Sequence, residues 1–219
     1  MKAAAQLWRL CAAIVDAIMP LRARTARLQK ADTSSFPLSP RVETIGGTRI
    51  TTLAAYHEQM IEDAIRALKY DGDARAAQLL ASGLADFLQE ELASLRAFSP
   101  RRIILVPVPL HAKRRRERGF NQIEKVLARL PVEMRAGPLC RVETRALFRT
   151  RATPPQTKLH RSERLRNLRG AFSVDEKRCR GAHVIVVDDV CTTGSTLREC
   201  AKTLEKAGAK VTALALARA

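Results

Sequence analysis

The sequence has few of the residues that several kinds of functional site require. The five cysteines form no C-x-x-C pair and the four histidines do not cluster with them, so neither a disulfide framework nor a structural zinc site is supported. Aromatic residues make up only 4% of the chain, which argues against a base-stacking surface built from Phe, Tyr and Trp. No uncharged apolar run reaches the ~18 residues of a membrane-spanning helix. We therefore expect a cytoplasmic protein with reduced thiols and no bound zinc.

Acidic residues are also scarce, and the imbalance is local. The chain carries 39 Lys and Arg against 22 Asp and Glu, a formal net charge of +17. Residues 101–170 hold 19 of these basic and 5 of these acidic residues, so that this stretch alone carries +14. Such a positive field attracts phosphates, whether those of a small anionic substrate or those of a nucleic acid. A merely solvated basic face is the alternative.

The N-terminal part of the chain divides into two expected units. Residues 1–48 are expected to form an amphipathic helix and a linker rich in turn-forming residues; Asp16 interrupts the apolar run, which argues against a signal peptide. The helix would dock on the body, a partner or a membrane surface. Residues 49–100 are expected to form a hood-like unit, with a hairpin around Gly46-Gly47 followed by helices from Tyr56 and from Ala74.

From residue 101 the pattern alternates between strands and helices. The expected strands are 103–108, 139–148, 184–187 and 211–217, and the expected helices are 119–130 and 196–207. A basic loop is expected at 111–118. The basic, proline-containing segment 149–170 is too long for an ordinary connection and is interpreted as a flexible lid, with a solvated loop as the alternative. The order predicts an α/β domain over 101–219, a parallel sheet flanked by helices.

The chemistry concentrates in VIVVDDVCTTGSTL, residues 184–197. A buried strand is expected to deliver Asp188 and Asp189 to the carboxyl edge of the sheet, where open α/β folds bind ligands. The following hydroxyl-rich loop leads into a helix N-terminus, whose free N–H groups and dipole favour an anion. Carboxylates beside a phosphate cradle suit a ligand that carries sugar hydroxyls next to its phosphate. We expect Cys191 to be a small buried residue rather than a nucleophile.

Three separated motifs resemble those of a known family. Residues 184–197 resemble the phosphoribosyl-pyrophosphate (PRPP) loop of type I phosphoribosyltransferases. VPVPLHAKRRRERGFNQ (106–122) and PPQTKLHRSERLRNLRGAF (154–172) are similar to segments of the ComF family, which is associated with competence and DNA uptake. Many relatives begin with a cysteine-rich zinc module, but residues 20–48 of this chain contain no cysteine, so zinc is not carried over.

The resemblance implies a Mg²⁺-dependent PRPP-binding protein of the phosphoribosyltransferase type. It assigns Asp188 and Asp189 to catalysis, and it assigns the 5′-phosphate to Thr192, Thr193, Gly194, Ser195 and Thr196. The pyrophosphate side would be formed by the basic residues His111, Lys113, Arg114 and Arg118. The lid would contribute Arg149, Arg151, Lys158 and Arg161. No direct protein ligand to the metal is expected, because Mg²⁺ would arrive with its substrate.

Three function classes are left open at this point. The first is an active transferase on an unidentified base or other nucleophile, and the second is a non-catalytic PRPP-binding protein. The third is a protein of DNA uptake or recombination that binds single-stranded nucleic acid or DNA-processing proteins. A homodimer is also left open. The acceptor cannot be read from the residues, because a fold does not by itself decide a function.

Overall fold

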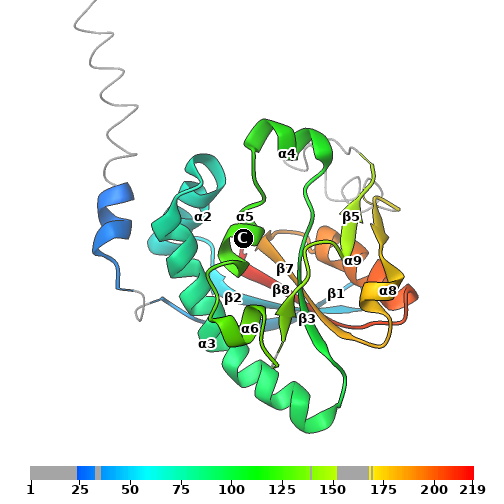
Figure 1. Ribbon diagram of the computed structural model, residues 1–219. Coiled ribbons are helices and arrows are strands. Elements are labelled where there is room, and N and C mark those ends of the chain that lie inside the picture. Colours follow the sequence, from blue (N-terminus) through cyan, green and yellow to red (C-terminus); the bar gives the residue numbers. More distant parts are fainter. Residues whose placement is uncertain (1–23, 33–35, 139, 152–167, 169) are drawn as a thin grey trace, which may run out of the picture.

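The computed structural model describes residues 24–32, 36–138, 140–151, 168 and 170–219 (Figure 1). The predicted amphipathic helix near the N-terminus therefore lies outside the described residues. Residues 24–30 are helical. The elements that follow, in chain order, are β1 (Arg41–Ile45), β2 (Thr48–Ala55), α2 (Gln59–Asp71), α3 (Ala74–Phe98), β3 (Ile103–Pro107), α4 (Ala112–Arg118), α5 (Gln122–Leu127), α6 (Val132–Arg135), β4 (Arg141–Val142), β5 (Leu147–Arg149), β6 (Phe172–Val174), α8 (Glu176–Cys179), β7 (His183–Cys191), α9 (Ser195–Lys206) and β8 (Lys210–Arg218).

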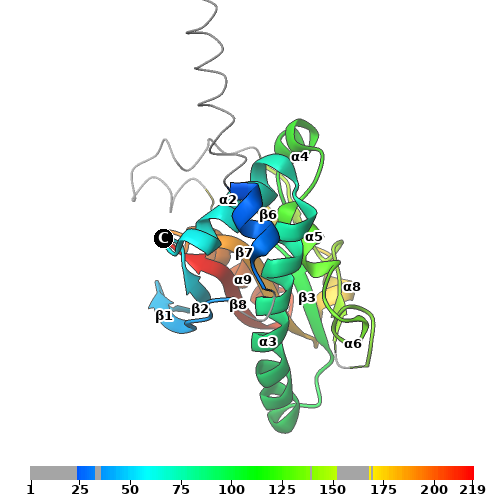
Figure 2. The ribbon, with the colours of Figure 1, turned by 90° about the vertical axis from the view of Figure 1, so that its left-hand side faces the viewer.

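A six-stranded sheet forms the centre of the molecule. Its strand order is β1-β2-β8-β7-β3-β4, and every neighbouring pair is parallel except β1 with β2. The short strands β5 and β6 pair separately as an antiparallel ribbon. Helices α2, α3 and α5 cover one face, and α9 covers the other (Figures 1 and 2). The fold class predicted from the sequence, α/β with a parallel sheet flanked by helices, is confirmed.

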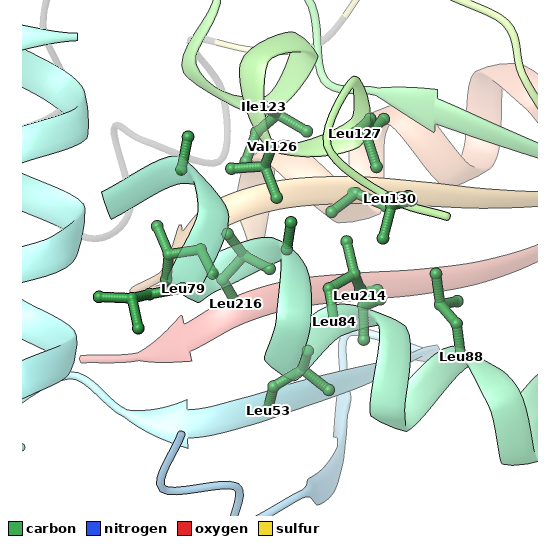
Figure 3. Packing of buried hydrophobic residues seen from close by; sticks show 14 of the residues in the cluster. Leu53, Leu79, Leu84, Leu88, Ile123, Val126, Leu127, Leu130, Leu214 and Leu216 are labelled. Atoms are coloured by element: carbon green, nitrogen blue, oxygen red, sulfur yellow. The ribbon is translucent and has the colours of Figure 1, made fainter. Parts of the chain in front are cut away.

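Strand residues alternate between two separate cores. Leu105, Ile185 and Leu214 pack against α2, α3 and α5, and Figure 3 shows Leu214 and Leu216 among the leucines of α3. Their chain neighbours Val106, Val186 and related residues pack with α9 on the opposite face. Because successive strand side chains point to opposite faces, a strand covered on both sides must be apolar at every position. This explains the continuous apolar runs that identified β3 and the first part of β7.

The sheet extends across the boundary expected at residue 100. The predicted hairpin is present: β1 and β2 pair antiparallel, and Gly46 and Gly47 between them have φ of 55° and 83°. β2 then pairs in parallel with β8, which places the hairpin in the same sheet as the C-terminal strands. The linker expected at the end of residues 1–48 therefore contains strand β1 and the first residue of β2. Hairpin residues help to position the candidate site described below.

The segment predicted as a basic loop, 111–118, is instead the helix α4. None of its residues is buried, so it carries none of the apolar periodicity that reveals a helix in a sequence. Its ends are nevertheless well defined. The His111 ring nitrogen Nδ1 accepts from the Lys113 backbone N–H at 3.2 Å, and Gly119 closes the helix in the left-handed conformation at φ 80°.

Two further elements differ from their predicted bounds. The strand expected over 139–148 is two short strands: β4 pairs with β3, whereas β5 turns away to pair with β6. The helix expected from Gly119 begins at Gln122, because the Asn121 side chain accepts from the Ile123 N–H at 2.9 Å and caps it. Among the described residues, no helix is long and apolar enough to span a bilayer.

Candidate functional site

Strand β7 carries the acid pair within the sheet rather than in a loop. The sequence predicts that the strand ends at Val187, but β7 continues to Cys191 because β8 stays paired with it, with Asp188 opposite Ala215 and Cys191 opposite Arg218. Asp188 and Asp189 are partly exposed at the carboxyl end of the strand. Their backbones are thus held by the ladder, and their side chains alternate between the two faces of the sheet.

The two carboxyl groups have different surroundings. Burial, and then the negative charge of Asp189, raises the pKa of Asp188 well above its usual range, although the nearby Arg149 guanidinium acts to lower it. Asp189 instead accepts a hydrogen bond from the Gln122 amide, from Nε2 to Oδ2 at 2.8 Å. Each carboxylate also accepts from the next backbone N–H, Asp188 from Asp189 at 2.9 Å and Asp189 from Val190 at 2.8 Å. These contacts fix the orientation of both groups.

A series of side-chain hydrogen bonds connects the acid pair to the basic helix α4. Arg118 donates from Nη1 to the side-chain oxygen Oε1 of Gln122 at 2.7 Å, and the side-chain nitrogen of Gln122 donates to Asp189. The opposite polarity of these two bonds leaves only one orientation for the Gln122 amide. Burial lowers the pKa of Arg118, while the negative charge of Asp189 opposes that shift. The start of α5 is anchored by Asn121, which donates to the Val108 carbonyl at 3.0 Å.

Gln122 was not among the residues singled out from the sequence. It is the last residue of the segment 106–122, which carries part of the family resemblance. A glutamine in the first turn of a helix does not by itself indicate a functional role. The side chain is buried, with 6% of its surface exposed. A buried polar side chain must find hydrogen-bond partners, and here the partners are a predicted catalytic acid and a predicted pyrophosphate-side arginine.

The predicted phosphate loop forms a small hollow at the start of α9. The hollow of about 20 Å³ is lined by Asp188 and by residues from Val190 to Leu197. The N-cap residue Gly194 has no side chain to cap α9, and the hollow lies at the positive end of the helix dipole, a location that favours an anion. The hydroxyls of Thr193 and Ser195 lie 3.0 Å apart.

Gly194 is required by both the backbone and the packing of this loop. Its φ of 68° lies in the left-handed region. A Cβ at this position would lie 2.8 Å from Ile50 Cδ1 and 2.9 Å from Ile45 Cδ1, both in the β1–β2 hairpin. On the other side of the loop, Arg218 donates to the Thr192 carbonyl at 2.6 Å and to Glu43 at 2.9 Å. The hairpin and the end of β8 therefore hold the loop in place.

The predicted pyrophosphate-side residues are brought to the same edge to different extents. Arg118 reaches the acid pair through Gln122. Arg114 is exposed on α4; burial is the main cause that lowers the pKa values of Arg118 and Arg149, and the positive charge of Arg114 lowers both further. His111 caps α4 with one ring nitrogen. Lys113 is exposed on α4.

Two of the four predicted lid residues lie among the described residues. Arg149 ends β5, and its guanidinium lies over the Phe172 ring with 5.6 Å between the guanidinium carbon and the ring centroid. Burial, followed by the charge of Arg114, lowers its pKa. Arg151 is exposed. Lys158 and Arg161 lie outside the described residues, so the lid remains a prediction.

An aromatic residue from the N-terminal half lies at the same edge of the sheet as the acid pair. Burial raises the pKa of Tyr56, and the negative charges of Glu62 and Asp189 act in the same direction. Tyr56 follows β2 directly and donates its backbone N–H to the Arg218 carbonyl at 2.8 Å. The expected hood segment thus reaches the edge where Asp188 and Asp189 lie.

Cysteines and metal-ligand clusters add nothing to this site. Cys191 lies beside the loop, and it is buried with 2% of its surface exposed. Burial raises the pKa of its thiol, which keeps the sulfur protonated and weakly nucleophilic. Within the described ranges, no group of three or more His, Cys, Asp or Glu side chains is placed to hold a metal ion.

Comparison with known proteins first defines the class. Residues 138–218 match the family model of the phosphoribosyl transferase domain. The matched region contains β7, the diacid, the glycine loop and α9, which are the parts that build the candidate site. Together with the parallel sheet, the match makes the chain an α/β protein of the phosphoribosyltransferase type.

Two curated relatives then define the family. The chain is 37% identical over 165 residues to the DNA utilization protein YhgH of Escherichia coli, covering 74% of this chain and 67% of that protein. It is 30% identical over 159 residues to the competence protein ComFC of Streptococcus pneumoniae, covering 70% of this chain and 61% of that protein. The chain belongs to the ComF family. A solved phosphoribosyltransferase from Corynebacterium diphtheriae is similar at 19% identity and a TM-score of 0.35, over 70% of this chain and 76% of that one, too distant to add to the argument.

Proposed function

We propose that this protein binds PRPP at the carboxyl edge of its sheet and transfers the phosphoribosyl group to an acceptor, releasing pyrophosphate. One observation carries the proposal. Asp188 and Asp189 lie at the end of β7 beside the N-terminus of α9, and Arg118 of α4 is linked to Asp189 through Gln122. A sugar carrying an anion at each end fits this order of groups, whereas a bare phosphate chain would be repelled by the acid pair.

Each group has a separate role in this proposal. The carboxylates of Asp188 and Asp189 accept hydrogen bonds from the ribose hydroxyls. The N–H groups and hydroxyls of residues 192–196 bind the 5′-phosphate. Arg118 and Arg114 stabilise the negative charge that develops on the departing pyrophosphate, assisted by His111 and Lys113. The segment 149–170 would close over the leaving group, as proposed from its sequence.

The site is compatible with a Mg²⁺ ion that arrives with the substrate. Mg²⁺ prefers water and phosphate oxygens to a full protein cage, so PRPP and water would hold it while Asp188 and Asp189 accept hydrogen bonds from the ribose hydroxyls. When bound, the ion supplies positive charge to the leaving pyrophosphate. The residues of the chain hold the ribose and exclude water.

The transfer itself needs no protein nucleophile. The bond between ribose C1′ and the pyrophosphate oxygen breaks, and the acceptor forms a bond to C1′ and gives up a proton where it carries one. The positive charge that builds on the ribose in between is close to the carboxylates of Asp188 and Asp189, which favours the charged state over the neutral reactant. The buried thiol of Cys191 has no part in these steps.

Calorimetric titration with PRPP and Mg²⁺ tests the binding part. The D188N/D189N variant keeps side-chain size but replaces anionic acceptors by amides, so affinity should fall by about 10-fold or more for each charged hydrogen bond lost. Asp86, exposed on α3, supplies the matched control D86N, which should bind as the parent protein does. Equal PRPP affinity in the double variant and the parent would refute the site. A screen of bases and other nucleophiles for pyrophosphate release tests catalysis.

A second candidate function is a non-catalytic role in DNA uptake or recombination. Two observations favour it: the relatives carry the names DNA utilization protein and competence protein, and α4 presents a row of exposed basic side chains. In this version PRPP binds as a signal and α4 contacts nucleic acid or a partner protein. PRPP binding without pyrophosphate release under any acceptor would favour this candidate over the transferase.

A further inference from the structure

A second cleft lies at the opposite edge of the sheet from the acid pair. It has a volume of about 580 Å³ and lies where α3 ends and where β3 and β4 begin. Figure 1 shows this end of α3 at the bottom of the molecule, away from α4 at the top. The lining includes Arg96, Arg101, Arg102 and Arg141, each of them exposed. Four guanidinium groups therefore surround one cleft that the phosphoribosyl chemistry does not use.

Three of these four arginines are held in place by backbone carbonyls. Arg96 donates to the Pro138 carbonyl at 2.6 Å, Arg101 to the Gly181 carbonyl at 3.3 Å, and Arg102 to the Arg178 carbonyl at 3.1 Å. Backbone carbonyls fix a guanidinium but carry no net charge. Among the described residues, no carboxylate forms a salt bridge with any of the four. A guanidinium in this condition keeps N–H donors for the phosphates of a ligand.

The positive charge continues along the edge beyond the cleft. Arg102 contacts the carbonyls of α8, which places exposed Lys177 next to the cleft. Lys210, which is also exposed, is the first residue of β8 and lies opposite His183 in the neighbouring strand β7. Burial lowers the pKa of His183, and the positive charges of Lys210 and Arg101 lower it further. Several exposed cations along one edge suit an extended polyanion better than a single small anion.

An exposed aromatic ring stands beside the cleft. Phe98 ends α3, directly before the lining residues Ser99 and Pro100, and 88% of its surface is exposed. It is the most exposed of the large apolar residues in the described part of the chain. Bases of a duplex are already paired and stacked, whereas an unpaired base can stack on such a ring. One ring is not a stacking platform, so phosphate contacts would dominate the affinity.

We propose that this arginine cleft binds single-stranded nucleic acid, with phosphates on Arg96, Arg101, Arg102 and Arg141 and one base on Phe98. The site is separate from the PRPP site and does not depend on the proposed transferase function. Because the two sites lie at opposite edges of the sheet, the protein can bind nucleic acid and PRPP at the same time. This differs from contact through α4, where PRPP and nucleic acid would compete for the same cations.

Fluorescence anisotropy of a labelled oligo-dT strand with the full chain, across a salt series, tests the proposal. The variant R101Q/R141Q removes two cleft cations, and K113Q/R116Q removes two from α4 as a charge-matched control. The cleft variant should weaken binding at least 10-fold and flatten the salt slope by about 1.4, at ~0.7 for each phosphate contact on a single strand. F98A should weaken binding about 5- to 100-fold and leave the slope unchanged.

Each remaining outcome has a definite meaning. Binding that persists at saturating PRPP supports the separate site, and displacement by PRPP overturns it. No binding at low salt, equal losses in the two charge-matched variants, or a loss confined to the α4 variant also overturns it. A duplex that competes as well as the single strand would refute the role of Phe98. PRPP titration of the cleft variant is run in parallel, so that failure of this proposal is separated from failure of the proposed transferase function.

Discussion

Gln122 should be a positioning residue for Asp189, and its replacement is the most direct test of the site geometry. The variant Q122M keeps the length of the side chain but has neither the amide N–H group that donates to Asp189 nor the carbonyl that accepts from Arg118. Asp189 would then be free to turn away from the ribose, and Arg118 would lose its link to the acid pair. Hydrogen bonds to charged groups contribute about 1.5–3 kcal/mol, which sets a loss of PRPP affinity of about 10- to 150-fold.

The variant Q122E separates positioning from packing. Its carboxylate pairs well with Arg118 but stands within hydrogen-bond distance of Asp189, where two negative charges repel each other. When the new carboxyl is protonated it can donate to Asp189 as the amide did. PRPP affinity, relative to the parent protein at the same pH, should therefore be low near about pH 8 and recover toward about pH 5. A purely structural role for Gln122 would give no such recovery.

The assay is calorimetric titration of PRPP with Mg²⁺ for the parent, Q122M, Q122E and a control. Gln89, exposed on α3, supplies the control Q89E, which adds the same charge away from the site. The control should bind PRPP as the parent protein does at both pH values. PRPP affinity of Q122M within twofold of the parent protein would refute the reasoning, as would a loss in Q122E that is independent of pH.

Four further predictions concern the loop, the acid pair, the proposed lid and α4. G194A should lower the free energy of unfolding by at least ~1–2 kcal/mol in urea titrations, because φ is 68° and the new Cβ meets the β1–β2 hairpin. D188N should stabilise the fold at neutral pH but not in acid. Because the pKa of Asp188 is raised in the folded protein, the stability of the parent falls as pH rises from the usual carboxyl range toward that raised pKa. Thermal unfolding of both proteins across pH shows whether the stability gained by D188N appears over this range. PRPP should protect residues 149–170 from hydrogen exchange; equal protection with and without ligand would exclude a lid. If α4 contacts nucleic acid, PRPP should displace it, with a salt slope of about −0.7 per phosphate, and the same anisotropy assay decides.

The sequence by itself determined the elements whose residues are buried or sterically constrained. A strand covered on both faces must be apolar throughout, which identified Ile103–Pro107 and the first part of β7. Residues 195–206 show helical periodicity, and the loop before them needs a glycine where φ is 68°. The acid pair and the hydroxyl-rich loop, being contiguous, indicated the kind of site before any contact between them was known.

Only the tertiary structure decided which distant segments meet. Gln122 lies 67 residues from Asp189, and no local pattern joins them, because their contact depends on how α5 packs beside β7. The pairing of β2 with β8 likewise depends on the order of strands in the sheet, which apolar runs do not encode. α4 is helical through its caps and the propensity of its Arg and Lys residues, with no buried face to reveal it. The arginine cleft gathers residues from the end of α3 to β4, so its charges became a site only through folding.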